Sequence, residues 1–160
     1  MNFVIRKGEV HDVNAILRLI KELAEFEKLP NEVEVTEDHL IRDGFSSNSK
    51  FKTFVAEDSD GFVIGMALFF ERYSTWKGRI IHLEDLMVTK SHRGIGAGKA
   101  LYTEVLKYAD LQGCKRVSWE VLDWNKSAVG FYESTGATIL DGWQVVHMNE
   151  TGLKEFVKKN

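Results

Sequence analysis

The first part of the chain shows the hydrophobic periods of one strand and two helices. Residues 3–6 read as a short strand. From there, apolar residues recur three and four positions apart, which predicts an amphipathic helix over residues 12–27 with Asp12 as its N-terminal cap. Pro30 prevents this helix from extending much further, because proline breaks helices. A second, short helix is predicted over residues 36–44, capped by a threonine and ended by a glycine.

The middle of the chain follows the two-residue period of strands. β-Branched and aromatic residues fill three runs, at residues 53–57, 62–72 and 80–88. The turn sequences Asp58-Ser59-Asp60-Gly61 and Thr75-Trp76-Lys77-Gly78 separate these runs. We therefore expect three consecutive antiparallel strands.

The last third of the chain alternates again between helical and strand patterns. Helical spacing returns after Gly98 and ends at Gly113. Further elements are then expected in this order: a strand over 116–122, a helix over 127–134, a final strand over 143–148 and a short helix over 153–157. Because no repeat or linker interrupts this order, residues 1–160 are expected to form one α/β domain.

Composition and charge exclude several classes of function. A formal net charge of −3 argues against a nucleic-acid-binding protein, which normally carries a basic stripe. No apolar run approaches the roughly 18 residues that cross a bilayer, and the opening residues lack the apolar core of a secretory signal. Cys114 is the single cysteine, so we expect a cytoplasmic protein without an internal disulfide. The histidines show no metal-ligand spacing, and no metal is expected.

The most specific motif is Arg93-Gly94-Ile95-Gly96-Ala97-Gly98, which joins the strand ending at Val88 to the next helix. Glycines let the backbone N–H groups turn toward one point. At a helix N-terminus these groups are unpaired and the dipole is positive, so the motif predicts a phosphate site. A turn that merely joins strand to helix is the alternative. A Walker loop is excluded because no Gly-Lys-Ser/Thr follows, and the spacing does not fit the dinucleotide fingerprint.

Read as Arg-x-x-Gly-x-Gly, this motif resembles the pyrophosphate loop of the GNAT N-acetyltransferases, which binds acetyl-CoA. The element order of the whole chain is also similar to that superfamily. Within it, the chain most resembles the diamine acetyltransferases, which include spermidine/spermine and thialysine N-epsilon-acetyltransferases. The stretches that carry this resemblance are residues 16–28, Leu83-Glu84-Asp85, Trp124-Asn125 and Phe131-Tyr132; residues 74–79 and 121–125 resemble the thialysine branch.

The resemblance implies a single GNAT domain of the α/β (α+β) class, with a central mixed, mostly antiparallel sheet flanked by helices. It implies acetyl transfer from acetyl-CoA to the primary amine of a small cationic substrate, most of all thialysine or a related lysine-like amino acid. Diamine or polyamine acetylation is the alternative. It also implies a homodimer, for which four aromatic residues could supply an exposed apolar patch: Phe69, Phe70, Tyr73 and Trp76.

Acetyl transfer to an amine raises two proton problems. A lysine-like amine has a pKa of about 10.4, so only roughly one molecule in a few thousand is a nucleophile at pH 7. The departing sulfur leaves more easily when it is protonated. The resemblance assigns the acid to Tyr132, whose ring could otherwise simply pack on the sheet. A non-catalytic acyl-CoA-binding module is disfavoured because such a protein has little reason to keep both an acid and a base.

Glu84 is the candidate base. It interrupts an otherwise apolar strand, where a carboxylate is costly unless it is used or paired. The alternative is a strand-edge carboxylate that faces water. Strand alternation separates Glu84 from Asp85, so we do not expect the two to form a dyad.

The remaining site residues follow from the resemblance. Contacts to acetyl-CoA are implied at Leu86, Met87, Val88, Arg93, Gly94, Ile95, Gly96, Ala97, Gly98, Lys99, Asn125, Lys126, Ser127 and Ala128. Contacts to the amine are implied at Phe26, Glu27, Glu84, Ser118, Trp119, Glu120 and Asp141. Glu27 has an independent rationale, since acidic residues at the end of the first helix attract an ammonium group. A substrate α-carboxylate would need a cation such as Arg79 or Lys77.

Overall fold

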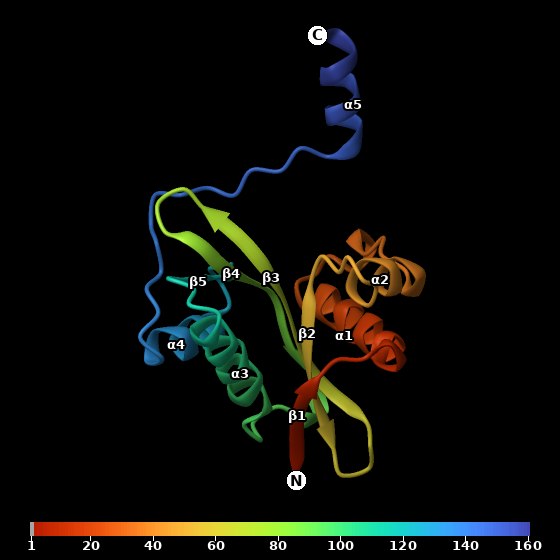
Figure 1. Cartoon of the computed structure of the whole chain (residues 1–160), viewed down its shortest axis with the longest axis vertical. Coiled ribbons are helices and arrows are strands. Elements are labelled where there is room, and N and C mark those ends of the chain that lie inside the picture. The colour runs from red at the N-terminus through yellow and green to blue at the C-terminus, as the bar shows by residue number, and fades with distance from the viewer. Residues whose placement is uncertain (1) are drawn as a thin grey trace. The chain divides into compact units, whose positions relative to one another are not determined.

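A five-stranded mixed sheet organises the first of two units of the chain (Figure 1). The computed structural model describes residues 2–160, and this first unit ends at Glu120. Four strands pair antiparallel in chain order: β1 (Phe3–Lys7), β2 (Lys52–Asp58), β3 (Val63–Ser74) and β4 (Gly78–Val88). The short β5 (Val117–Ser118) pairs parallel to β4. The predicted mixed, mostly antiparallel sheet is confirmed.

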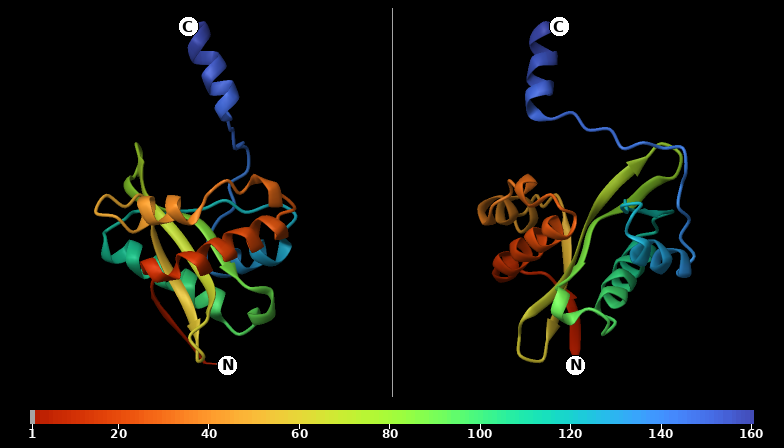
Figure 2. Two further views of the ribbon diagram at one scale, coloured as in Figure 1. Left: turned by 90° about the vertical axis from the view of Figure 1, so that its right-hand side faces the viewer. Right: turned by 180° about the vertical axis from the view of Figure 1, so that it is seen from behind.

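Helices cover both faces of this sheet. In Figures 1 and 2, α1 (Val13–Phe26) and α2 (Glu37–Gly44) lie on one face, and α3 (Ala97–Leu111) lies on the other. Three short 3-10 helices complete the unit: η1 (Val10–Asp12), η2 (Pro30–Glu32) and η3 (Lys90–His92). Among residues 2–160, no helix is long and apolar enough to cross a membrane.

The hydrophobic core fills the space between the sheet and its helices. On the α1 face, Ile16 and Leu19 are buried with Val55 and Met66 of the sheet. Full burial of such a side chain stabilises the fold by about 1.5–3 kcal/mol. The burial of one face of the helix explains why the helical period of residues 12–27 correctly predicts α1.

The aromatic patch expected at a dimer interface is partly wrong. Phe69 is only 1% exposed, and its ring stacks on Phe54 at a centroid distance of 5.2 Å. Tyr73 and Trp76 are exposed, the latter to 79%. The difference arises because Phe69 points to the α3 face of the sheet, where its ring also contacts Tyr108.

Asp12 does not cap α1 with its side chain, contrary to the sequence prediction. Its carboxylate instead accepts hydrogen bonds from the Arg6 guanidinium at 2.7 and 2.8 Å and from the backbone N–H of Glu9 at 2.8 Å. Arg6 also binds Glu57 of β2 at 2.5 Å. The buried aspartate thus joins β1 to the start of α1.

The second unit, Val121–Asn160, contains α4 (Lys126–Ser134) and α5 (Glu150–Lys159). Asn125 caps α4, because its side-chain oxygen accepts a hydrogen bond from the backbone N–H of Ala128. The predicted strand over residues 143–148 is wrong, since these residues form no strand in the structure. The strand predicted over 116–122 is confirmed only for β5. Alternation signals strand propensity, but a strand also needs a neighbouring edge with which to pair.

Candidate active site

A β-bulge at Glu84 is the central irregularity of the sheet. In the pairing of β3 with β4, Leu68 lies opposite Asp85 and Phe69 lies opposite Leu83, so Glu84 is the extra residue on β4. A bulge interrupts the regular alternation of side chains and redirects them. The argument that alternation separates Glu84 from Asp85 therefore fails at this position. Sequence patterns carry no signal for the bulge, because the local residues suit an ordinary strand.

The edge of β4 beyond the bulge lacks a neighbouring strand. β5 pairs with β4 only at Ile81 and His82, and no other strand of the described residues pairs with that side of β4. An unpaired strand edge offers backbone N–H and C=O groups to a partner of extended shape. The predicted pantetheine contacts, at residues 86–88, lie on this stretch.

The charges of Glu84 and Glu27 both act on the carboxyl group of Asp85. Burial raises the pKa of Asp85 to about 6, and the charges of Glu84 and Glu27 add to the effect. Burial also raises the pKa of Glu27, which follows the last residue of α1. The structure thus joins the predicted Glu27 and Glu84 through Asp85, which the sequence analysis had not assigned to the site. Clustered carboxylates favour the binding of a cation, because the cation relieves their mutual repulsion.

Glu84 and Ser118, both expected in the site, are joined by His82. Its Nε2 lies 3.4 Å from Oε2 of Glu84, and its Nδ1 lies 3.2 Å from Oγ of Ser118. Interaction with His82 lowers the pKa of Glu84, although partial burial opposes this shift. His82 was missed because one histidine in an apolar strand reads as a core residue.

The glycine loop leaves the N-terminus of α3 open. Gly94 and Gly96 have φ angles of 83° and 90°, in the left-handed region that favours glycine. Gly96 is the N-cap residue of α3, and among residues 2–160 no side chain caps this end. The first backbone N–H groups of the helix are therefore available to an anion. This arrangement fits the pyrophosphate that the motif predicted.

Arg93 connects the glycine loop to β4 and α1. Its Nε donates a hydrogen bond to the carbonyl oxygen of Val88 at 3.1 Å, and its guanidinium lies 5.0 Å from the ring centroid of Phe26. A residue predicted to contact the cosubstrate and one predicted to contact the amine therefore touch each other. The contact holds the end of α1 beside the glycine loop.

The other predicted residues have distinct places. The ring of Trp119 meets that of Tyr102 on α3 edge to face at a centroid distance of 5.5 Å, and Glu120 is exposed. Ile95, Ala97, Gly98 and Lys99 lie in the glycine loop and the first turn of α3. In the second unit, Tyr132, Lys126, Ser127 and Ala128 lie on α4, and Asp141 lies in a turn after it.

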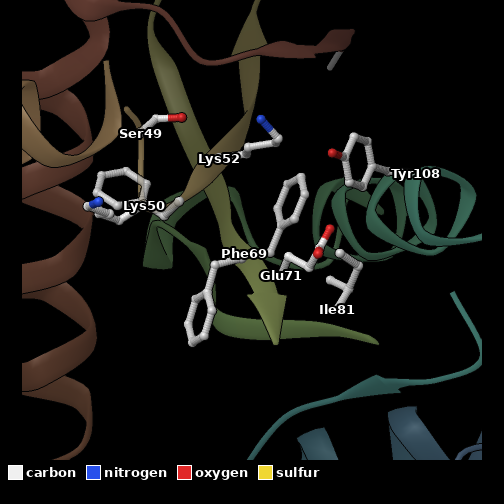
Figure 3. Close-up of a pocket in the computed structure, with 9 residues that line it drawn as sticks. Ser49, Lys50, Lys52, Phe69, Glu71, Ile81 and Tyr108 are labelled. Carbon is white, nitrogen blue, oxygen red and sulfur yellow. The ribbon is translucent and has the colours of Figure 1, made fainter. Parts of the chain in front are cut away.

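The structure also contains a cavity of about 320 Å³ (Figure 3). It is lined by Ser49, Lys50, Phe51, Lys52, Phe69, Phe70, Glu71, Ile81 and Tyr108, none of which was predicted for the site. Figure 3 shows Lys52 of β2 and Tyr108 of α3 beside Phe69. Within residues 2–160, no cluster of three or more His, Cys, Asp or Glu side chains could hold a metal ion.

The fold and the glycine loop are those of an N-acetyltransferase. The sequence profile of the "Acetyltransferase (GNAT) family" matches residues 14–137, and the chain belongs to this family. It is 39% identical to the thialysine N-epsilon-acetyltransferase of Bos taurus over 170 residues, which cover 99% of this chain and 100% of the relative. It is also 34% identical to spermidine/spermine N(1)-acetyltransferase-like protein 1 of Homo sapiens, over 94% of this chain and 23% of that protein.

A solved structure supports the same fold. An integron cassette protein from V. cholerae superposes with a TM-score of 0.79 and covers 99% of both chains. The sequence identity is 24%, so this likeness concerns the fold alone.

Proposed function

We propose that this chain transfers the acetyl group of acetyl-CoA to the primary amine of a small cationic substrate of the thialysine or lysine-like class. The observation that carries the proposal is the juxtaposition of the Glu84 bulge, with its neighbouring carboxyl groups, and the unpaired edge of β4. The similarity to thialysine N-epsilon-acetyltransferases over nearly the full chain supports the substrate class.

Three carboxyl groups act at the amine end of the proposed site. Glu27 and Asp85 attract the ammonium group, because a cation stabilises their charged forms. Glu84 takes a proton from the ammonium, directly or through a water molecule, and so produces the neutral nucleophile. Its carboxylate is ionised at neutral pH, because its pKa lies below the ordinary value.

The glycine loop and the edge of β4 act at the acetyl-CoA end. The open N-terminus of α3 binds the pyrophosphate, and the backbone of residues 86–88 pairs with the pantetheine arm. The resemblance to the family implies further contacts at residues 125–128, at the start of α4. Acetyl-CoA supplies an activated acyl group when it is bound.

The proton balance of the reaction requires an acid as well as a base. A bond forms between the amine nitrogen and the acetyl carbon, and the bond from that carbon to sulfur breaks. The ammonium nitrogen loses two protons in all, one before the attack and one as the amide forms, and both pass through Glu84 to solvent. The resemblance to the family assigns the proton that the sulfur receives to the hydroxyl of Tyr132 on α4, which then regains a proton from solvent. The reaction therefore releases one proton in net.

Polyamine acetylation is the second candidate, and the position of Arg79 favours it. A lysine-like substrate has an α-carboxylate that needs a cationic partner. Arg79 is already bound to Glu71, with an N–O distance of 2.6 Å, and both side chains are exposed. A polyamine has no carboxylate and needs only acidic partners. The similarity to the human spermidine/spermine acetyltransferase-like protein is consistent with this candidate.

A substrate panel tests the proposal. Acetyl-CoA consumption should be fastest with thialysine, slower with lysine and simple diamines, and slowest with peptides. Faster turnover of spermidine than of thialysine would favour the polyamine candidate. In parallel, acetyl-CoA should raise the melting temperature, whereas NAD and ATP should not. Consumption with none of these amines would contradict the proposed function.

The role of Glu84 needs its own measurement. Glu84→Gln should lose kcat/KM most strongly at pH 6.5 and recover partly toward pH 9.5, because alkaline solution deprotonates the amine without a protein base. The control is Glu104→Gln, since Glu104 lies on the exposed side of α3 and pairs with Lys107. An equal loss at every pH would mean that Glu84 holds the substrate and is not the base.

A further inference from the structure

His82 occupies the point where three strands meet. It lies on β4 opposite Phe70 of β3, and it pairs with Ser118 of β5 on the other side. Its ring is buried and packs against the ring of Phe70 at a centroid distance of 5.2 Å. His82 is therefore held by packing and strand pairing on both sides of β4, two residues before the bulge.

Both ring nitrogens of His82 face polar groups. Nε2 faces the carboxylate of Glu84 at 3.4 Å, and Nδ1 faces the hydroxyl of Ser118 at 3.2 Å. A carboxylate only accepts hydrogen bonds, so the proton of a neutral imidazole is required on Nε2. In that tautomer Nδ1 accepts the hydroxyl proton of Ser118. The two neighbours together favour this tautomer of the neutral ring and this ring orientation.

Glu84 needs an external partner to hold its orientation. As the bulge residue it has no opposite residue on β3, and its side chain is 53% exposed. His82 supplies a basic ring nitrogen 3.4 Å from its carboxylate. A half-exposed glutamate without such a partner samples several rotamers, whereas a base must be aimed at its proton.

We propose that His82 is a positioning residue that holds the carboxylate of Glu84 toward the amine, with its own ring oriented by Ser118. This inference rests on the proposed role of Glu84 as the base. It assigns to Ser118 a role that differs from the direct substrate contact expected from sequence: Ser118 acts on the imidazole, and the imidazole acts on the base.

A pH profile distinguishes this role from a purely structural one. The titratable groups that face Glu84 are His82 and Asp85 on β4, and Glu27 beyond α1 acts on Asp85. His82 lowers the pKa of Glu84 against the opposing effect of partial burial, while the charges of Glu84 and Glu27 raise the pKa of Asp85. Loss of His82 should therefore raise the pKa of Glu84 and weaken the base most at low pH.

Three variants test the inference. His82→Phe keeps a ring against Phe70 but removes both nitrogens, His82→Gln keeps an N–H donor, and Ser118→Ala removes the hydroxyl. The matched control is His39→Gln, on the exposed surface of α2. Two quantities are measured: kcat/KM for the best amine from pH 6.5 to 9.5, and the titration of the Glu84 carboxyl carbon by ¹³C NMR without substrate.

We expect His82→Phe to lower kcat/KM about tenfold or more at pH 6.5, with a smaller loss at pH 9.5. The Glu84 titration should move to higher pH. His82→Gln should restore most of the activity, Ser118→Ala should shift the profile in the same direction by less, and His39→Gln should match wild type. If His82→Phe does not fold, the pH profile of Ser118→Ala tests the inference in its place.

Two results would overturn the inference, and they are distinguishable. If the titration of Glu84 is unchanged in His82→Phe, His82 does not act on Glu84. If His82→Phe does not fold, a wild-type pH profile in Ser118→Ala would lead to the same conclusion. Wild-type turnover in Glu84→Gln would instead overturn the proposed base, and the catalytic role of His82 with it, even if the titration of Glu84 depends on His82.

Discussion

The carboxyl groups of Glu27 and Asp85 interact electrostatically although they lie on different elements. Glu27 follows α1, whereas Asp85 is a partly buried residue next to the β4 bulge. The pKa of Asp85 rises from 3.8 to about 6, first because of burial and then because of the charges of Glu84 and Glu27. The folded protein therefore holds a proton on Asp85 more tightly than the unfolded chain does.

Asp85→Asn should stabilise the ligand-free protein and weaken amine binding. Since the folded pKa is raised, wild type loses stability as pH rises from about 4 to 6. The variant avoids this loss. The difference in free energy of unfolding between variant and wild type therefore grows from pH 4 to 6, to at most about 3 kcal/mol, and is constant at higher pH. Urea unfolding at pH 4, 6 and 8 measures the difference, and the KM for the amine should increase. An advantage that is equal at pH 4 and 8 would refute the raised pKa.

Gly96→Val should weaken binding of acetyl-CoA far more than it weakens the fold. A side chain at φ 90° is strained by about 1–2 kcal/mol, and it obstructs the open N-terminus of α3. Gly61→Val is the matched control: Gly61 has a φ of 83° in the β2–β3 turn, and in both glycines a Cβ would meet no atom within 4 Å. Calorimetry should show weak binding only for Gly96→Val. Equal affinity in both variants would make Gly96 a turn residue alone.

Tyr132→Phe should lower kcat by roughly 10²–10⁴ and leave the affinity for acetyl-CoA unchanged. The substitution keeps the ring on α4, which lies 5.2 Å from that of Phe131, and removes only the hydroxyl. Tyr73→Phe, on the exposed end of β3, is the control. Steady-state kinetics and a melting curve measure the two effects, and wild-type turnover would reject Tyr132 as the acid.

Asp12→Asn should destabilise the fold by about 1.5–3 kcal/mol at pH 7, because it removes the buried carboxylate that binds Arg6 and leaves Glu57 as the remaining charged partner of the guanidinium. Burial alone would raise the pKa of Asp12, but the hydrogen bonds from Arg6 outweigh it and the net pKa is lowered. This stabilisation is therefore complete above the unfolded value near 3.8 and is lost as pH falls through the lower folded value. Unfolding curves of wild type and variant should converge below pH 4. Asp60→Asn, in an exposed turn, should change little.

The protein should sediment as a homodimer at micromolar concentration, with about twice the chain mass of 18.3 kDa. This prediction rests on the resemblance to the diamine acetyltransferases and on the exposed rings of Tyr73 and Trp76 at the β3–β4 hairpin. Trp76→Glu should weaken the dimer without lowering the melting temperature of the monomer. A single species at the monomer mass for wild type would reject the prediction.

Local patterns predicted most of the elements because they report burial on one face. The spacing of Ile16 and Leu19 indicated α1, and the glycines of the turns indicated the β2–β3 and β3–β4 hairpins. The same logic failed for residues 143–148, which form no strand although their residue types suit one, because a strand forms only by pairing with another strand. It also misassigned Asp12, because a cap and a buried ion-pair partner look identical in sequence.

The residues of the candidate site that belong to sequence motifs could be predicted, whereas those that depend on the pairing register of the strands could not. The glycine loop and Glu84 stood out as residue types that an ordinary strand or helix does not need. His82 and Asp85 did not, since their importance comes from the bulge and from the two-residue pairing of β5. Register between strands is a tertiary property, and no single segment of the chain contains it.

The short β5 has a consequence for solubility as well as for binding. Natural sheets usually protect their edges, because an unpaired edge recruits strands from other molecules and promotes aggregation. Here the first unit leaves β4 without a strand partner beyond His82, where a ligand can pair with the backbone. An occupied edge is no longer a template for self-association. On the proposed function, binding of acetyl-CoA along this edge would therefore also reduce self-association of the protein.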